Sequence, residues 1–185
     1  MISKKEVLEI LKDNIRNKNL RKHHYAVGAA MHALAGEYGG DQHKWEIVGL
    51  LHDADYEETK DDPSRHGLVM AEKMEKHGLA EDITRAIKAH NYEYTGSIPK
   101  SKMEWALVTC DDLTGLIVAA ALVNPNKIDG VSVKSVMKKF GSKSFAAGAD
   151  RERIKLCEEK LDTPLEEFVG IVLKAMKEVS EELGL

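Results

Sequence analysis

The chain has 185 residues, a length that fits one folded domain able to bury its own core. Acidic residues outnumber basic ones by 31 to 27, and this balance argues against a surface that coats nucleic acid. The first residues form a charged amphipathic pattern rather than a secretory signal, and the longest apolar run, residues 113–123, is too short to cross a bilayer. Two isolated cysteines form no recognisable spacing motif. We therefore expect a cytoplasmic protein without a membrane segment.

Helical periodicity recurs along the chain, and no segment alternates as a strand does. The first helix is predicted over residues 4–18, and the second over 20–38, ending at a pair of glycines. Further helices are predicted over residues 42–52, 64–77, 80–90, 101–123, 132–140, 150–161 and 164–183, with loops at 53–63 and 91–99. The sequence thus predicts an all-α bundle of about eight to nine helices, folded as a single domain over residues 1–185.

Four of the eight histidines fall on apolar faces of the predicted helices. His23 precedes apolar residues at i+3, i+4, i+7 and i+11, while His52, His66 and His90 also share faces with apolar side chains. Asp111 faces inward in the most apolar helix, with no lysine or arginine one turn away on that face. A single inward histidine is usually an ordinary core residue, but a buried carboxylate needs a partner. Together, these residues predict a shared metal site.

The ligand types narrow the choice of metal. Asp53 directly follows His52 where the helix is expected to end, so both side chains can reach one ion. Imidazoles and carboxylates without thiolates suit Mn, Fe, Co, Ni or Zn, and they disfavour a cysteine-rich structural zinc site. We expect one or two divalent transition-metal ions.

Three stretches resemble those of a known family. Residues 20–27 contain His23, residues 50–53 end in a His-Asp doublet, and residues 110–115 contain Asp111. These motifs resemble the HD-domain superfamily of metal-dependent phosphohydrolases, and the resemblance maps its ligand set to His23, His52, Asp53 and Asp111. It covers most of the chain, extends into residues 145–148 and Arg151, and is closest to the small stand-alone hydrolases. It implies one HD domain with a metal-ligand core at about 20–123 and C-terminal helices at about 132–183 packed on that core.

His66 and His90 resemble the additional ligands of the two-metal HD branch, in which Asp53 would bridge the ions. Two alternatives stay open at this point: both histidines bind substrate phosphate beside a single metal, or both lie on the surface. The Gly-Tyr-Pro signature of the cyclic-dinucleotide phosphodiesterase branch is absent from the sequence, which puts that substrate in doubt.

The resemblance implies hydrolysis of a phosphate monoester or diester of a nucleotide or small phosphorylated metabolite. We expect hydroxide on the metal to attack the phosphorus, because a bound divalent ion activates water and polarises a phosphoryl oxygen. The positive charge of two such ions would exceed the negative charge of the two aspartates and favour a small anionic substrate. We expect no nucleic-acid surface and no contact with a membrane. The oligomeric state is left open.

Three other residues are candidates for supporting roles. Asp55 is a candidate general acid or a partner that orients a ligand, since it closely follows the His-Asp doublet. Arg65 is a candidate phosphate contact, although a solvated charge at the start of a helix is the simpler explanation. Thr114 lies on the same helix face as Asp111 and is a candidate contact for that residue or for phosphate.

Three other functions remain possible for the same chain. The six ligands would also serve an oxygen-dependent di-iron enzyme of the superfamily. A metal-stabilised regulatory or binding module without turnover is a further alternative, although the intact ligand set argues against it. A purely structural bundle would leave the inward histidines and aspartates unexplained.

Overall fold

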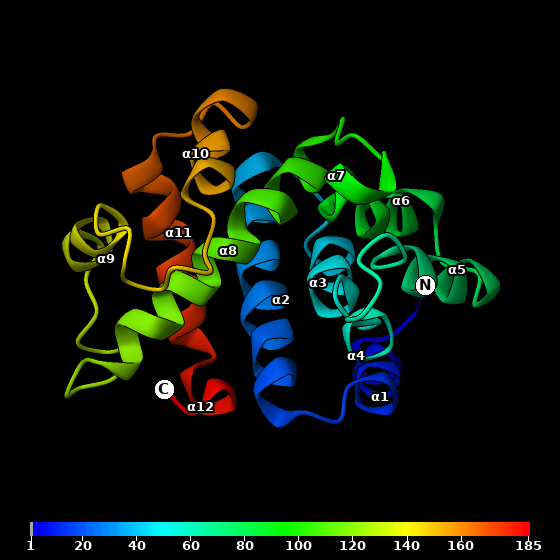
Figure 1. The fold of residues 1–185 in the computed structure, drawn as a ribbon, viewed down its shortest axis with the longest axis horizontal. Helices are drawn as coiled ribbons and strands as arrows, with labels where there is room; N and C mark the ends of the chain where they lie inside the picture. The colour runs from blue at the N-terminus through cyan, green and yellow to red at the C-terminus, as the bar shows by residue number, and fades with distance from the viewer. Residues whose placement is uncertain (1) are drawn as a thin grey trace.

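A computed structural model describes residues 2–185, and every regular element in that range is a helix (Figure 1). The longer helices are α1 (Lys4–Asn14), α2 (Lys18–Tyr38), α3 (Gln42–Leu51), α5 (Leu68–Lys76), α6 (Glu81–His90), α8 (Lys102–Leu122), α9 (Val133–Phe140), α10 (Arg151–Lys160) and α11 (Leu165–Glu178). The one-turn helices are α4 (Tyr56–Thr59), α7 (Tyr92–Thr95) and α12 (Ser180–Leu183). The predicted all-α class is confirmed.

The boundaries differ from the predicted ones where caps and turns intervene. The first helix ends at Asn14, because Asn17 caps the next helix by accepting hydrogen bonds from the Asn19 and Leu20 amides. The fourth predicted helix begins at Leu68 instead of residue 64, since Gly67 has a φ of 82°, which a helix cannot contain. Short helices also occupy parts of the two predicted loops.

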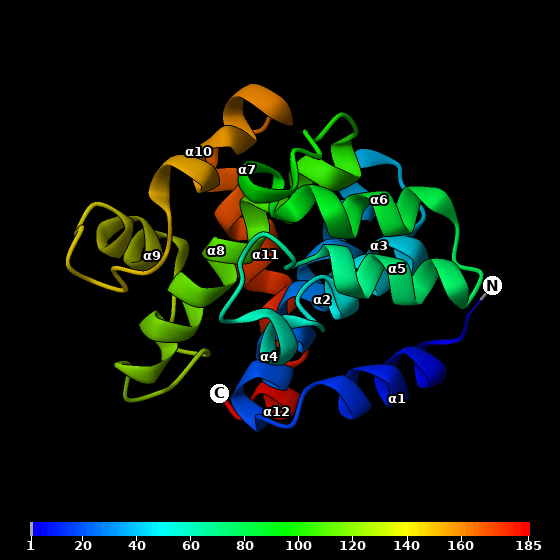
Figure 2. The same ribbon diagram turned by 45° about the vertical axis from the view of Figure 1, so that its right-hand side comes forward.

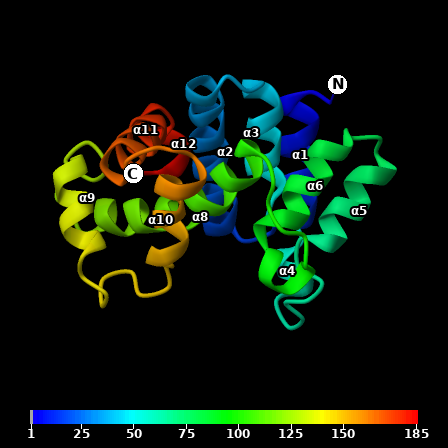
Figure 3. The same ribbon diagram turned by 90° about the horizontal axis from the view of Figure 1, so that it is seen from above.

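Helices α2 and α8 lie in the middle of the molecule. Helices α9 to α12 flank them on one side, and α1 and α3 to α6 on the other (Figures 1 and 3). The main packing partners of α2 are α3, α8 and α11. Helix α5 packs against α6 (Figure 2). This arrangement brings the middle of α2 and of α8 close to the ends of α3 and α6.

Helix α8 is long and apolar enough to cross a membrane, although its longest apolar run is short. About 61% of the most apolar stretch of this helix is buried inside the protein. Core helices of globular proteins commonly meet the same length and composition criterion. Its apolar character is therefore accounted for by its central position.

Helices α2 and α3 pack tightly against each other at two glycines. A Cβ atom on Gly49 would lie 2.7 Å from the carbonyl oxygen of Val27 and 2.8 Å from the Cα of Gly28. A Cβ on Gly28 would in turn lie 2.9 Å from Cγ of Leu50. This close contact sets the position of the C-terminal end of α3 relative to α2.

Replacing Gly49 with alanine is expected to destabilise the protein by about 1–3 kcal/mol, because the added methyl group meets backbone atoms that must move apart. Gly115→Ala is the matched control. Its Cβ would meet nothing within 4 Å, and alanine in a helix interior is expected to stabilise by about 0.5–1 kcal/mol. Urea unfolding of both variants measures the difference, and equal free energies of unfolding would contradict the packing argument.

Candidate metal centre

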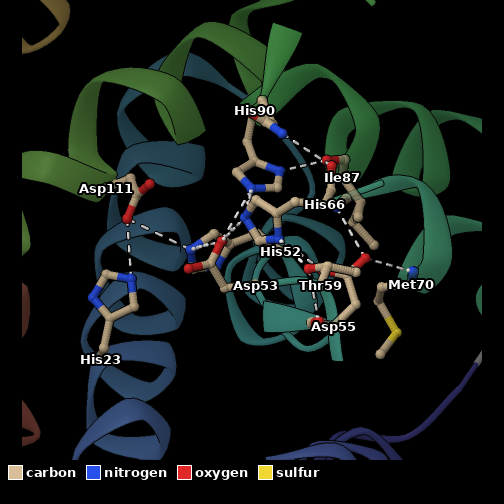
Figure 4. Close-up of polar contacts among 12 residues, drawn as sticks. His23, His52, Asp53, Asp55, Thr59, His66, Met70, Ile87, His90 and Asp111 are labelled. Carbon is tan, nitrogen blue, oxygen red and sulfur yellow. Dashed lines mark hydrogen bonds and ion pairs between the residues drawn. The ribbon is translucent and has the colours of Figure 1, made fainter. Parts of the chain in front are cut away.

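The six predicted ligands meet where α2, α8 and the ends of α3 and α6 converge (Figure 4). His23 comes from α2, Asp111 from α8, and His90 from the last position of α6. His52 and Asp53 follow the last residue of α3, and His66 precedes α5. The structure thus brings together side chains that lie far apart in the sequence, and their roles as metal ligands stay a prediction.

Asp53 lies at the centre of this group. Its Oδ1 atom is 3.0 Å from Nε2 of His66, 3.0 Å from Nε2 of His90 and 3.4 Å from Nε2 of His52. The Nε2 atoms of His66 and His90 are 3.0 Å apart. One carboxylate oxygen therefore faces three imidazole nitrogens.

Asp111 forms the second carboxylate of the centre. Its Oδ1 atom is 3.0 Å from Nε2 of His23 and 3.5 Å from Nε2 of His52. Ligand atoms that can hold an ion fall into two groups, one of His23, His52 and Asp53 and one of Asp53, His66 and His90. Asp53 belongs to both groups.

The far nitrogens of three imidazoles are held by hydrogen bonds. Nδ1 of His52 lies 2.8 Å from the carbonyl oxygen of Gly49, and Nδ1 of His90 contacts the carbonyl oxygen of Ile87. Nδ1 of His66 donates to Oδ1 of Asp55 over 2.9 Å. A donor at Nδ1 leaves Nε2 of the neutral ring free as a ligand, which is the usual arrangement at metal sites.

The residues present fit a divalent metal. Nε2 of His52 is buried and has no hydrogen-bond partner, although two carboxylate oxygens lie within 3.5 Å of it. A buried imidazole nitrogen without a partner is costly, and coordination of an ion would satisfy it. The donor set of imidazole and carboxylate suits first-row transition metals.

The centre is closed at one end and open at the other. The His52 side chain is fully buried and that of His90 is 4% exposed, whereas that of His23 is 27% exposed. On the open side, His23 and Asp111 line a pocket of about 300 Å³. Solvent and small molecules therefore reach the centre from the His23 side.

The charges of the aspartates shift the ionisation of their neighbours. Burial by itself lowers the pKa of His52, but the charges of Asp53 and Asp111 outweigh it and raise that pKa to about 9. Burial likewise opposes protonation of His66, while hydrogen bonds to Asp53 and Asp55 raise its pKa to about 10. Burial raises the pKa of Asp111, yet His52 and His23 bring it below its usual range. Without metal, protons occupy the positions that an ion would take.

Metal affinity is expected to rise with pH. Because coordination requires neutral imidazoles, binding displaces the protons of His52 and His66, and affinity gains up to about tenfold per pH unit for each displaced proton. The raised pKa values stabilise the metal-free fold below pH 6.5, and this stabilisation is lost as the pH rises through about 9 to about 10. Calorimetry in buffers of different ionisation enthalpy counts the protons, and thermal unfolding from about pH 6 to about pH 10 follows the stability.

A histidine outside the centre provides the control for this experiment. His77→Gln removes an exposed imidazole at the end of α5 and is expected to release as many protons on metal binding as the unmodified chain. His66→Gln is expected to release fewer. Equal metal affinity at about pH 6 and about pH 9 would contradict proton displacement.

Asp55 supports His66 from below the centre. Its side chain is fully buried, and its Oδ2 atom accepts hydrogen bonds of 2.9 Å from the amides of Gly67 and Met70. Burial raises the pKa of Asp55, but the hydrogen bonds from His66, Met70 and Gly67 outweigh this and lower it. Of the two roles predicted for Asp55, the geometry favours orienting a ligand, because an ionised carboxyl has no proton to give as a general acid.

The other two candidate residues do not reach the centre. Arg65 is 53% exposed, and its Nη2 atom lies 3.6 Å from Oε1 of Glu58. Thr114 is buried, and its hydroxyl donates to the backbone carbonyl of Asp111 over 2.8 Å rather than to the carboxylate. Neither side chain contacts a ligand side chain of the centre, and a contact of either with a phosphate group stays a prediction.

The opposite wall of the pocket comes from a segment without predicted structure. Ala146, Gly148 and Ala149 line it together with Asp112. The guanidinium of Arg151 donates to the carbonyls of Phe145, Ala146 and Ala149, and Asp112 accepts the Asp150 amide over 3.0 Å. An arginine in the first turn of a helix opposes the helix dipole, and this is the signal in the sequence that could have indicated a role for Arg151 in holding this wall.

His24 lies behind the centre and belongs to neither ligand group. It is almost fully buried, with its ring centroid 5.3 Å from that of His52. Burial lowers the pKa of His24 to about 3, so the ring is neutral. His23, and not His24, is thus the histidine that faces Asp111, as the sequence predicted.

Comparisons with known proteins find similarity in the same region. A sequence model of the HD domain matches residues 20–122, which is more than half of the chain. Ribonuclease Y of Oleidesulfovibrio alaskensis is 29% identical over 99 residues, which cover 54% of this chain and 18% of that protein. Ribonuclease Y of two strains of Nitratidesulfovibrio vulgaris has the same identity and coverage. No solved structure matches the chain.

The similarity to ribonuclease Y covers less than a fifth of the length of those relatives, so the activity of the whole relatives is not assigned to this chain. The matched region runs from α2 to the end of α8 and contains all six residues of the centre. On this match, the chain belongs to the HD domain family of metal-dependent phosphohydrolases.

Proposed function

We propose that this protein hydrolyses a phosphate monoester or diester of a nucleotide or small phosphorylated metabolite at the metal centre. The observation that carries the proposal is the position of Asp53, whose carboxylate belongs to both groups of ligand atoms. Two adjacent ions sharing one carboxylate are the arrangement that in-line phosphoryl displacement uses. We propose that the centre would hold two ions, with Asp53 contributing to both groups of ligands.

Some residues of this chain hold the imidazole ligands in place, and others line the side from which the substrate enters. Asp55 and the carbonyls of Gly49 and Ile87 hold the imidazoles so that each presents a free Nε2 atom. Divalent ions, when bound, supply activated water and polarise the phosphoryl oxygen. The substrate enters on the side of His23 and Asp111, because that side faces the pocket. Burial of His52 and His90 excludes solvent from the other side.

The surroundings of the centre favour a small substrate over a polynucleotide. Two pockets adjoin His23, and among the described residues that line them Lys22 is the one basic side chain. Proteins that bind nucleic acid use several basic residues along the backbone path. The name ribonuclease Y describes the relatives, and for this chain we propose a small anionic phosphoester as the substrate.

Elemental analysis and a substrate panel test this proposal together. The purified protein is expected to carry one or two transition-metal ions per chain. With Mn²⁺ or Co²⁺ it is expected to hydrolyse members of a panel of nucleotides and small phosphoesters faster than a short RNA. The control is His77→Gln, which lies outside the centre and is expected to keep metal content and activity.

Several outcomes would overturn the proposal. A protein that carries no metal and takes up no Mn²⁺, Co²⁺ or Fe²⁺ has no such centre. A metal-loaded protein that cleaves only RNA acts on a different substrate class. Oxygen uptake by the reduced iron form without phosphoester hydrolysis assigns the centre to a di-iron oxygenase instead.

A further inference from the structure

A second pocket adjoins the open side of the metal centre. It has a volume of about 370 Å³ and shares His23 and Gly115 with the pocket that contains Asp111. Beyond these two residues its walls include Val118, Leu122 and Leu183. A molecule bound at the open side of the centre can therefore extend into a largely aliphatic space.

The wall of this pocket and the metal centre lie on one stripe of α8. Gly115, Val118 and Leu122 follow Asp111 at i+4, i+7 and i+11, which places all four residues on the same helix face. From Gly115 to Leu122 the stripe runs about 10 Å at 1.5 Å per residue. The surface thus changes from a carboxylate to aliphatic side chains along one line.

Leu122 is unusually exposed for a leucine. Leu122 is 71% exposed, and the adjacent Val123 is 61% exposed. An exposed apolar patch next to a polar centre often marks a place where an apolar ligand group binds. Leu122 lies in the wall of the second pocket, which is continuous with the centre. An apolar group of a ligand bound at the centre can therefore contact it.

Gly115 has no evident structural reason to be glycine. A Cβ atom there would meet nothing within 4 Å, and its φ is not in the left-handed region. Glycine in a helix interior destabilises the helix relative to alanine. Its absent side chain leaves open the passage between Asp111 and the second pocket.

From these observations we propose that the second pocket binds the apolar part of the substrate. The substrates of the centre are accordingly phosphoesters that carry an alkyl chain or an aromatic ring. The phosphoryl group lies beside His23 and Asp111, and the apolar group lies along Gly115, Val118 and Leu122. This inference rests on the proposed phosphohydrolase function, and binding can test it separately from turnover.

A series of alkylphosphonates, which are not hydrolysed, tests the pocket directly. Protein loaded with Mn²⁺ is titrated calorimetrically with methyl-, butyl- and hexylphosphonate. Affinity is expected to rise about two- to fourfold for each added methylene until the pocket is filled. The quantity compared between variants is the ratio of hexylphosphonate affinity to methylphosphonate affinity.

Three variants localise the effect. Gly115→Leu fills the passage and is expected to bring the ratio close to one. Leu122→Ala removes part of the wall and is expected to lower the ratio severalfold, and its exposed position leaves folding intact. Val123→Ala is the matched control, since this neighbour is similarly exposed but does not line the pocket. It is expected to keep the ratio of the unmodified chain.

The outcomes separate this inference from the proposed function. A ratio near one in the unmodified chain overturns the inference, as does a ratio that Gly115→Leu and Leu122→Ala leave unchanged. Chain-length dependence without hydrolysis of any phosphoester overturns the proposed function and leaves the pocket assignment standing. No phosphonate binding by the metal-loaded protein overturns both.

Discussion

Replacing Asp53 with alanine is expected to remove most of the bound metal and to lower phosphoester hydrolysis at least about a thousandfold. Loss of an outer partner of a ligand already costs about 10–100-fold, and Asp53 contacts three imidazoles itself. Its removal also leaves His66 and His90, whose Nε2 atoms are 3.0 Å apart, facing one another without a carboxylate between them. Elemental analysis of the purified variant and hydrolysis rates with added Mn²⁺ measure the two effects.

An acidic residue nearby in sequence provides the comparison. Asp61 is exposed in the segment between α4 and α5, and Asp61→Ala removes the same charge from the chain. This variant is expected to keep its metal content and its activity. An Asp53→Ala protein with full activity would rule out the role proposed for this carboxylate, whatever its metal content.

The second large effect is expected at Asp55, where two substitutions separate folding from metal binding. Asp55→Ala leaves the buried amides of Gly67 and Met70 without an acceptor, which costs about 1–3 kcal/mol for each group. It also releases Nδ1 of His66, so metal affinity is expected to fall about 10–100-fold. Urea unfolding of the metal-free protein and calorimetric titration with Mn²⁺ measure the two losses.

Asp55→Asn is the sharper variant. Its amide oxygen can still accept from the two backbone amides, while its NH₂ group faces His66 and donates to Nδ1. The proton of the neutral ring then moves to Nε2, which can no longer bind a metal. We expect nearly normal stability with a metal affinity as low as that of the alanine variant. Normal metal affinity in Asp55→Asn would show that Asp55 does not set the tautomer of His66.

Helix phase was sufficient to predict the inward direction of His23, His90 and Asp111, but not that of His66, which precedes α5 in a run of turns and not in the predicted helix. In a helix, each residue turns about 100° from the previous one, so apolar neighbours show which histidines face the core. His23 and Asp111 lie within long helices, and the predicted phase matches the face that meets the centre. The predicted end of α3 likewise placed the consecutive residues His52 and Asp53 just beyond the helix, where both side chains reach the centre.

The predictions were less specific where no helical phase applies. Arg65 lies in a run of turns before α5, and its long side chain pairs with Glu58 on the surface. Thr114 does lie in a helix on the predicted face, but its short hydroxyl reaches the carbonyl of the preceding turn, a common competitor for such side chains. The wall formed by residues 146–149 has no periodicity at all, and its position depends on contacts with Arg151 and Asp112.

The close approach of α2 and α3 also has no signature in helix phase. Glycine at residue 49 is compatible with any exposed or buried helix position, and only the neighbouring backbone shows why a side chain is excluded. The sequence also does not show which backbone carbonyl will hold a histidine ring, as that of Gly49 holds His52, because every residue carries a carbonyl group.

The ligands come from segments spread between residues 23 and 111, so an ion at the centre would tie distant parts of the chain together. Any local opening that separates those segments would then have to release the ion first. An ion present at about a thousand times its dissociation constant adds about 4 kcal/mol to that opening. Amide hydrogen exchange in α3, α5 and α6 should slow accordingly on metal loading, while α9, which holds no ligand, should exchange as before. The same centre that is proposed to perform the chemistry would then also set how long this half of the molecule stays closed to proteases.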